Sequence, residues 1–298
     1  MKKTTMTMAL LLAVAFRPAA AADTQQERFP TPDAAAKALA TAARANDTAR
    51  LAAVLGADSE AVVSSGDPVD DARARKQYAT WAAERTQVEQ TPEGDHAIVH
   101  VGKEDWPLPI PLVHEGNAWR FDTAAGKEEL LNRRIGRNEL STISTCRTYV
   151  EAQHEYAARF HEYAQVLRST PGKHDGLYWE ASGKEESPLG PLVAEATAEG
   201  YAVTDSAKPA PYHGYYFRPL KAQGAHAPGG ARDWVKDGKM TGGFGLLAWP
   251  AEHGASGVMT FIVGPQGVVF QKDLGAQTEE AAKAITTYDP DGSWNPTR

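Results

Sequence analysis

The sequence predicts an α+β protein in which helices are followed by an antiparallel sheet, and this order occurs twice along the chain. Three observations support the prediction. Helical runs with capping residues precede segments of alternating polarity in residues 29–125, and a long helical run precedes a second set of alternating segments in residues 137–291. A single cysteine in 298 residues permits no disulfide within the chain, so hydrophobic cores must hold the fold together.

The first 22 residues have the pattern of a secretory signal peptide. Two lysines near the start precede an apolar run over residues 6–16, and the small residues 19–22 predict cleavage near Ala22. Eleven apolar residues are too few to span a bilayer, which needs about 20. We therefore expect a periplasmic or secreted protein without stable membrane insertion. Cleavage would change the net charge from −7 to −10, which argues against nucleic acid as a partner.

The first expected domain, residues 29–125, opens with helices. Thr31 is a suitable cap for a helix that ends at Arg44, and a proline follows it at the first helical position. Thr48 predicts the cap of a second helix, which Gly56 ends. These signals predict a helical hairpin at the start of the domain.

A third helix is expected over residues 68–83, with a solvated basic face formed by Arg73, Arg75 and Lys76. Alternation then predicts an antiparallel sheet of three strands: residues 96–101, 108–114 and 118–122. Helices followed by a curved antiparallel sheet are the order of cystatin-like domains. The stretches PTPDAAAKALATAARANDTARLAAVLG and GNAWRFDT resemble the cone-shaped fold of the nuclear-transport-factor-like superfamily. That fold carries enzymes and binding modules alike, so the resemblance implies no particular chemistry.

A long helix is expected over residues 126–168, with a weak break at Gly136. Its first part, residues 126–136, forms the junction between the two expected domains. Tyr149, Tyr156 and Tyr163 recur every seven residues, so a continuous helix would place them on one face. We expect this stripe to pack on a sheet.

The second domain, residues 137–291, continues with a short helix over residues 191–200 and then with β structure. Four strands are expected: residues 212–220, 242–249, 257–263 and 268–273. A long helix across such a sheet resembles the soluble half of pilin-like proteins. The sequence lacks the hydrophobic N-terminal half-helix of pilins, so the resemblance does not extend to pilus assembly.

Several long sequence blocks together resemble one family more specifically. The blocks include DWPLPIPLV, WRFDTAAGKEELLNRRIGRNEL, STPGKHDGLYW and GVMTFIVGPQGVVFQKDLG. They are similar to the exported bacterial family known as domain of unknown function 2950, and the resemblance runs from about Phe29 to Asp291. It implies an envelope location and no established activity, substrate or catalytic residue.

Few patterns in the sequence indicate chemistry. A phosphate-binding glycine loop, a dinucleotide fingerprint and a zinc cysteine pattern are all missing, so we expect no cofactor and assign no catalytic residue. His154 and His161 would lie about 10.5 Å apart along a helix axis, too far apart to share one metal ion, so we predict no metal site. Cys146 has apolar or small neighbours at helical spacing and is expected to be buried and inert.

Two groups of polar side chains are candidates for ligand contact. Arg133 and Arg137 lie one helical turn apart; they could hold a carboxylate or phosphate together, or form ion pairs with Glu128, Glu129 and Glu139. In the segment Tyr212–Arg218, strand alternation would place His213 on one face with Tyr215 and Phe217, and Tyr212, Tyr216 and Arg218 on the other.

The resulting hypothesis is a non-catalytic binding or assembly module of the cell envelope. Its aromatic surfaces, around Trp106, Tyr212, Tyr216 and Trp249, would contact another envelope protein or a small ligand. The alternative is a periplasmic hydrolase that uses His213 with an acidic partner in a groove of the C-terminal sheet. A pocket holding a histidine with an oriented carboxylate would favour the hydrolase, whereas a flat exposed aromatic patch would favour binding.

Overall fold

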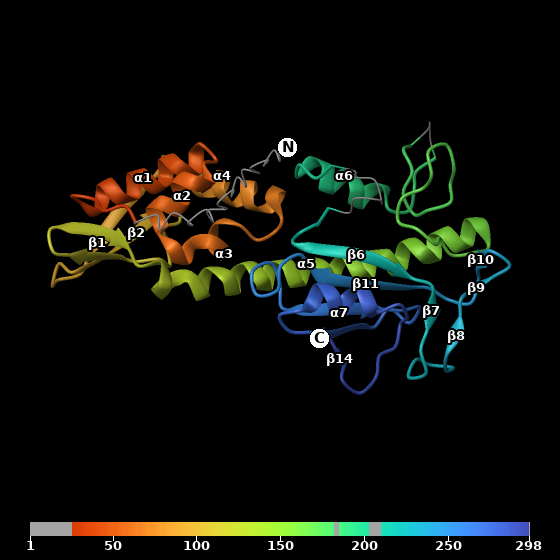
Figure 1. The fold of residues 1–298 in the computed structure, drawn as a ribbon. Helices are drawn as coiled ribbons and strands as arrows, with labels where there is room; N and C mark the ends of the chain where they lie inside the picture. Colours follow the sequence, from red (N-terminus) through yellow and green to blue (C-terminus); the bar gives the residue numbers. More distant parts are fainter. Residues whose placement is uncertain (1–25, 182–184, 203–209, 298) are drawn as a thin grey trace, which may run out of the picture.

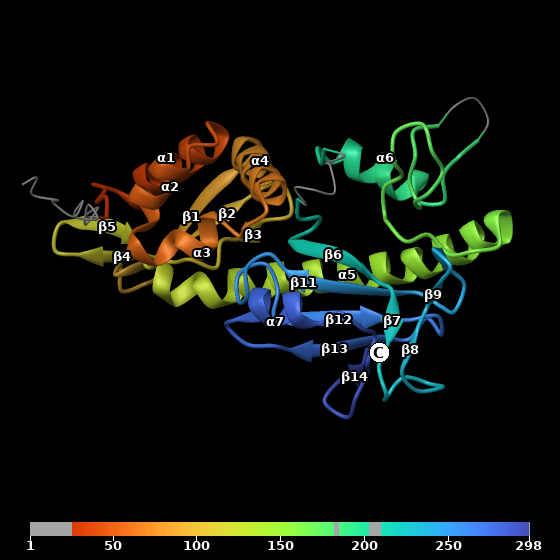
Figure 2. The same cartoon turned by 45° about the vertical axis from the view of Figure 1, so that its right-hand side comes forward.

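The computed structural model describes residues 26–181, 185–202 and 210–297, and it confirms the predicted α+β class. Two five-stranded antiparallel sheets lie side by side along one long helix (Figures 1 and 2). The predicted signal peptide and its cleavage site at Ala22 lie outside the described residues. Within the described ranges, no helix is both long and apolar enough to cross a membrane.

The N-terminal half opens with the predicted pair of helices, α1 (Pro32–Arg44) and α2 (Thr48–Leu55). The Thr31 hydroxyl caps α1 by accepting a hydrogen bond from the Ala34 amide. The cap of α2 is Asp47, whose Oδ1 accepts from the Arg50 amide at 2.8 Å, so the prediction of Thr48 as the cap is one residue too late.

Two short helical turns, η1 (Ala57–Ser59) and α3 (Glu60–Val63), lead to α4 (Pro68–Glu84). α4 begins at the predicted proline. The Asp67 carboxylate caps it by accepting hydrogen bonds from the Val69 and Asp70 amides, both at 3.1 Å.

The first sheet is an antiparallel meander in the order β1-β2-β4-β5, with β3 paired to β2. Its strands are β1 (Thr86–Gln90), β2 (His96–Val101), β3 (Trp106–Pro107), β4 (Leu112–Glu115) and β5 (Ala118–Phe121). The sequence did not reveal β1, because its side chains TQVEQ are polar and mostly exposed. The predicted strand over residues 108–114 is wrong in extent. Its first part contains two prolines, which cannot donate hydrogen bonds to a β-ladder, so regular pairing with β5 is confined to residues 112–115.

Helix α5 (Thr123–Phe160) is continuous through Gly136 and has 38 residues, about 57 Å of helix. It ends where His161 adopts a left-handed conformation with φ 59°, so the predicted extension to residue 168 is wrong. Tyr149 and Tyr156 are buried on α5. Tyr163 lies beyond the helix end, where its amide donates to the Met240 carbonyl. It reaches the same core from a loop, with its ring 4.8 Å from that of Phe244.

The second sheet has the order β14-β13-β12-β11-β6 and is antiparallel throughout. Its strands are β6 (Tyr215–Leu220), β11 (Gly245–Pro250), β12 (Met259–Val263), β13 (Val269–Asp273) and β14 (Asn295–Pro296). α5 crosses one face of this sheet, and α7 (Thr278–Ala284) lies against β11 on the other (Figure 1). The peripheral elements are α6 (Gly190–Ala198), β7 (Ala222–Gln223), β8 (Arg232–Asp233), β9 (Val235–Lys236) and β10 (Lys239–Met240).

Each half of the molecule has its own hydrophobic core. The N-terminal core includes Ile110, Leu112 and Phe121, whereas the C-terminal core includes Tyr149 and Trp234. Each sheet takes its strands from one half only.

The first turns of α5, which include residues 126–136, pack on the N-terminal half. A Cβ on Gly126 would lie only 2.3 Å from the Pro109 carbonyl oxygen, so glycine is needed where the helix meets this loop. The helix therefore joins the two cores.

Candidate functional site

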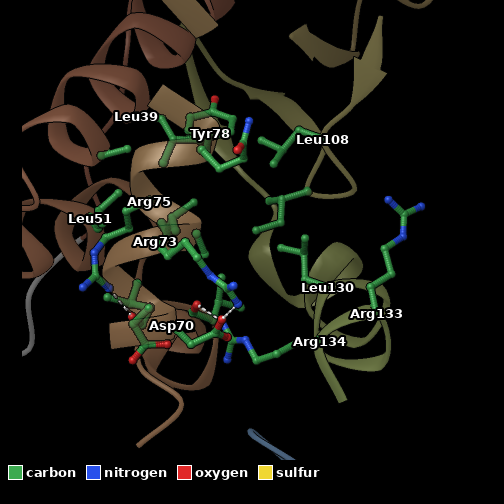
Figure 3. Close-up of a pocket in the computed structure, with 18 of the residues that line it drawn as sticks. Leu39, Leu51, Asp70, Arg73, Arg75, Tyr78, Leu108, Leu130, Arg133 and Arg134 are labelled. Carbon is green, nitrogen blue, oxygen red and sulfur yellow. Dashed lines mark hydrogen bonds and ion pairs between the residues drawn. The ribbon is translucent and has the colours of Figure 1, made fainter. Parts of the chain in front are cut away.

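A cavity of about 570 Å³ lies in the N-terminal half, between α4 and the first turns of α5 (Figure 3). Its wall is largely aliphatic and comes from the five helices α1 to α5, from β3 and from the loop after β3; the aliphatic side chains include Leu39, Leu51, Leu55, Leu108, Ile110 and Leu130. The volume falls in the range of small-molecule sites, roughly 300–1,000 Å³.

Tyr78 lines this cavity from α4, beside Leu39 and Leu108 (Figure 3). Its hydroxyl oxygen is buried and has no hydrogen-bond partner among the described residues. Burial raises the pKa of Tyr78 above its ordinary value, so the phenol stays neutral. A buried hydroxyl without a partner is costly and uncommon in folded proteins.

Charged side chains also line the cavity, and Asp70 and Arg134 lie away from Tyr78 (Figure 3). Five arginines and two aspartates contribute to the lining: Arg73, Arg75, Arg133, Arg134, Arg137, Asp70 and Asp71. Both aspartates are buried and paired. Asp70 forms an ion pair with Arg73, and Asp71 accepts hydrogen bonds from the Ser65 amide and hydroxyl at 2.9 and 2.7 Å. Burial raises the pKa of Asp71 although these hydrogen bonds oppose the shift.

Two of the arginines are used to hold the walls together. Arg134 on α5 donates to the carbonyls of Ala61 and Val62 at 2.7 and 2.6 Å, which ties α5 to α3. Arg75 on α4 donates to the Val63 carbonyl at 2.9 Å. Burial lowers the pKa of Arg134, while Asp71 and Asp70 favour its charged form.

Three of the predicted contact residues meet at this cavity. The guanidinium carbon of Arg133 lies 5.8 Å from the centre of the Trp106 ring, and the Nε of Arg133 is 2.7 Å from the Glu129 carboxylate. Arg137 is exposed one turn further along α5 and makes no hydrogen bond or ion pair in the described part of the chain. Glu139, a predicted partner of these arginines, instead accepts from the Val258 and Met259 amides.

Tyr212 and His213 lie elsewhere, in a tight turn before β6. The amides and carbonyls of Tyr212 and Tyr215 pair across the turn, and His213 and Gly214 have φ of 48° and 75°. The predicted strand alternation is therefore wrong for Tyr212 and His213, because the strand begins only at Tyr215. The predicted alternation also places Tyr216 and Arg218 on one face, which is consistent with their positions in β6.

The imidazole of His213 does have an acidic neighbour. Its Nε2 lies 3.0 Å from Glu199 Oε2, and Glu199 also lies 3.4 Å from Arg73, one of the residues that line the cavity. His213 itself does not line that cavity. Among the described residues, His213 contacts Glu199, Tyr201 and Tyr212, none of which is a serine, threonine or cysteine nucleophile.

The buried carboxylate of Asp67 joins the two halves next to this turn. While its Oδ1 caps α4, its Oδ2 accepts hydrogen bonds from the Tyr201 hydroxyl at 3.0 Å and from the Gly214 amide at 2.8 Å. A Cβ on Gly214 would approach Asn138 Nδ2 to 2.6 Å, so this close contact also requires glycine.

Tyr216 and Trp249 form a cross-strand pair on β6 and β11, with ring centres 5.6 Å apart. The guanidinium of Arg218 lies 5.5 Å from the Trp249 ring centre, and it donates to the carbonyls of Ala282 and Ile285 at the C-terminal end of α7. This pair belongs to the second sheet, whereas Trp106 lies in the first, so the structure does not bring the four predicted aromatic residues into one surface.

Sequence reasoning missed the part that α4 plays in the cavity. Arg73 is exposed, as expected for a solvated face, but it and the half-buried Arg75 also line the cavity beside the buried Asp70 and Asp71. The one available signal was the spacing of Asp70 and Arg73, three residues apart in a helix. Helical spacing places Tyr78 on the partly apolar face of this helix, but the sequence gives no signal that its hydroxyl lacks a hydrogen-bond partner, because that depends on residues distant in the chain.

His154 and Cys146 lie in α5, and His161 directly follows its last residue. His154 packs edge-on against Phe244 with ring centres 5.4 Å apart, and His161 ends the helix. Cys146 is fully buried, and burial raises its pKa to about 12. Within the described ranges, no group of three or more histidine, cysteine, aspartate or glutamate side chains is arranged to hold a metal ion.

Together these features define an α+β protein with two antiparallel sheets on one long helix and a cationic-rimmed apolar cavity in its N-terminal half. The family model described as "Protein of unknown function (DUF2950)" matches residues 26–297, so the chain belongs to that family, as its sequence blocks predicted. Comparison with curated proteins and with solved structures gave no significant match. The cystatin-like and pilin-like resemblances stay predictions.

Proposed function

We propose that the protein is an exported, non-catalytic binding module whose N-terminal cavity holds a small, largely apolar ligand. The observation that carries the proposal is a largely aliphatic cavity of about 570 Å³ that is lined by Tyr78, a residue whose buried hydroxyl has no partner among the described residues. A bound molecule with one hydrogen-bonding group would satisfy this hydroxyl while its apolar part covers the aliphatic wall. Another envelope protein remains the alternative partner for the aromatic pair on the second sheet.

Export is supported by the charged start, the short apolar run and the small residues before Asp23. The proposal places the protein in the periplasm or outside the cell. We expect the N-terminus of the protein from an envelope fraction to lie at or near Ala22 or Asp23; the intact Met1 terminus in cytosol would contradict it.

Occupancy of the cavity can be tested with diphenylhexatriene, a hydrocarbon whose fluorescence rises in apolar surroundings. Ala74 lines the cavity on α4, so Ala74→Leu should fill part of it and weaken probe binding about tenfold or more. Ala83→Leu adds the same atoms on the same helix outside that cavity and is the matched control. Both variants should keep the parent's circular dichroism spectrum. Absence of probe binding to the parent, or equal binding to Ala74→Leu, would overturn the proposal.

A hydrolase is a second candidate, favoured by the 3.0 Å contact between His213 and Glu199. Imidazole beside a carboxylate is a suitable general base. In that case short aryl esters should be hydrolysed by the parent and not by a His213→Gln variant of equal thermal stability. Equal rates for the two proteins would remove this candidate.

A further inference from the structure

We infer that the ligand of the N-terminal cavity is an amphipathic anion, with an apolar body in the cavity and an anionic group held by Arg137 together with Arg133. This inference rests on the proposed binding function and names the chemical class of the ligand. The anionic group is a carboxylate or a phosphate, since both match the fork of donors on a guanidinium.

The charge around the cavity is opposite to that of the whole protein. The chain has a formal net charge of −7, yet five arginines and only two aspartates line this cavity. A positive surface in an acidic protein concentrates anions locally while the rest of the molecule repels them.

Most of the lining charges already have partners. Asp70 is paired with Arg73, and Asp71 with Ser65. Arg75 and Arg134 donate to main-chain carbonyls, as described above. These side chains organise the wall and leave little capacity for a ligand.

Arg133 and Arg137 retain that capacity. Arg133 uses its Nε for Glu129 and lies over Trp106, and its terminal nitrogens donate to nothing in the described ranges. Arg137 makes no hydrogen bond or ion pair in the same ranges. The two residues are four apart on α5, about 6 Å along the axis, so their side chains can reach one anion. The charge of Arg137 also lowers the pKa of Arg134, after the larger effect of burial, so the rim contains repulsion that an anion would relieve.

The lining also has a direction. Tyr78, Leu39 and Leu108 lie at one end, while Asp70 and Arg134 lie at the other and Arg133 stands on the α5 side (Figure 3). An amphipathic molecule can therefore place its apolar part near Leu39 and Leu108 with its charged end at α5.

Displacement of diphenylhexatriene by a matched series of twelve-carbon compounds tests the inference: dodecanol, dodecylamine, dodecanoate and dodecyl phosphate, each below its micelle concentration. The parent should bind at least one of the two anions about tenfold or more tightly than dodecanol, because hydrogen bonds between a guanidinium and an anion are stronger than those between neutral groups. Comparison of dodecanoate with dodecyl phosphate identifies the preferred head group.

The variants Arg137→Gln and Arg133→Gln/Arg137→Gln should reduce the preference for anions, the double variant to less than about twofold, without changing the affinity for dodecanol. Arg147→Gln removes an exposed arginine of the same helix outside the cavity and should leave both affinities unchanged. If the parent binds diphenylhexatriene but takes dodecanol as tightly as both anions, the inference is wrong and the cavity proposal stands. If the probe itself does not bind, the proposed function fails first.

Discussion

At the scale of single residues, the Tyr78 hydroxyl is expected to contribute to ligand affinity and not to the stability of the fold. Its hydroxyl has no partner among the described residues, so Tyr78→Phe removes a costly group and should leave the free energy of unfolding unchanged or slightly higher. We expect the melting temperature of the variant to equal or exceed that of the parent. Affinity for dodecanol, which offers a hydroxyl, should fall relative to affinity for diphenylhexatriene, which offers none. A melting temperature several degrees lower would show that the hydroxyl has a structural partner.

His226 provides a residue-scale test of electrostatics. Hydrogen bonding to Asp289, at 3.0 Å between Nδ1 and Oδ2, raises the pKa of His226 above 6.5. Because the folded state binds this proton more tightly, the pair stabilises the protein below pH 6.5 and the effect is lost as pH rises through the folded pKa. His226→Asn should therefore melt below the parent at pH 5 and together with it at pH 8.5. The opposite order would contradict the assigned direction.

At the scale of elements, α5 shows that equal spacing in sequence does not mean equal packing. Tyr156 is buried on the helix, and its hydroxyl donates to the His174 carbonyl at 2.7 Å. Tyr156→Ala should cost about 3–5 kcal/mol in the free energy of unfolding. Tyr163→Ala is the comparison, since this ring is only partly buried and lies beyond the helix, and it should cost less. Denaturant curves would contradict this account if the Tyr156→Ala curve overlay that of the parent.

At the scale of the whole molecule, Asp67 connects the two halves outside α5. Asp67→Ala loses the α4 cap, which costs about 0.5–2 kcal/mol, and also the contacts to Tyr201 and Gly214. Asp47→Ala loses only the α2 cap and is the matched control. The Asp67 variant should cost about 1–3 kcal/mol more than the control and should show faster hydrogen exchange at the Gly214 amide. Equal costs and unchanged exchange would mean that this contact does not hold the halves together.

The local sequence carried much of the secondary structure. A capping threonine and a proline located the start of α1, and a proline located the start of α4. Local sequence signals gave the wrong backbone conformation where contacts with residues distant in the chain determine it. Residue 161 continues a helical pattern in sequence, yet it adopts a left-handed conformation that turns the chain towards Met240.

The candidate site was predictable only in part. Trp106, Arg133 and Arg137 were recognised as contact residues, because an aromatic ring and two arginines at helical spacing have recognisable binding chemistry. Their common cavity was not predictable, since its wall runs from Leu39 to Arg137 and depends on how α5 packs against α4.

The sequence by itself determined the family, the α+β class, the cap of α1 and the acidic charge of the chain, because each of these depends on composition or on residues a few positions apart. Only the tertiary structure decided that Asp70 and Asp71 are buried beside arginines, that Tyr78 lacks a partner and that His213 lies in a turn beside Glu199. The physical reason is that burial and pairing are set by contacts between residues far apart in the chain, as in the bond from Asp67 to Gly214.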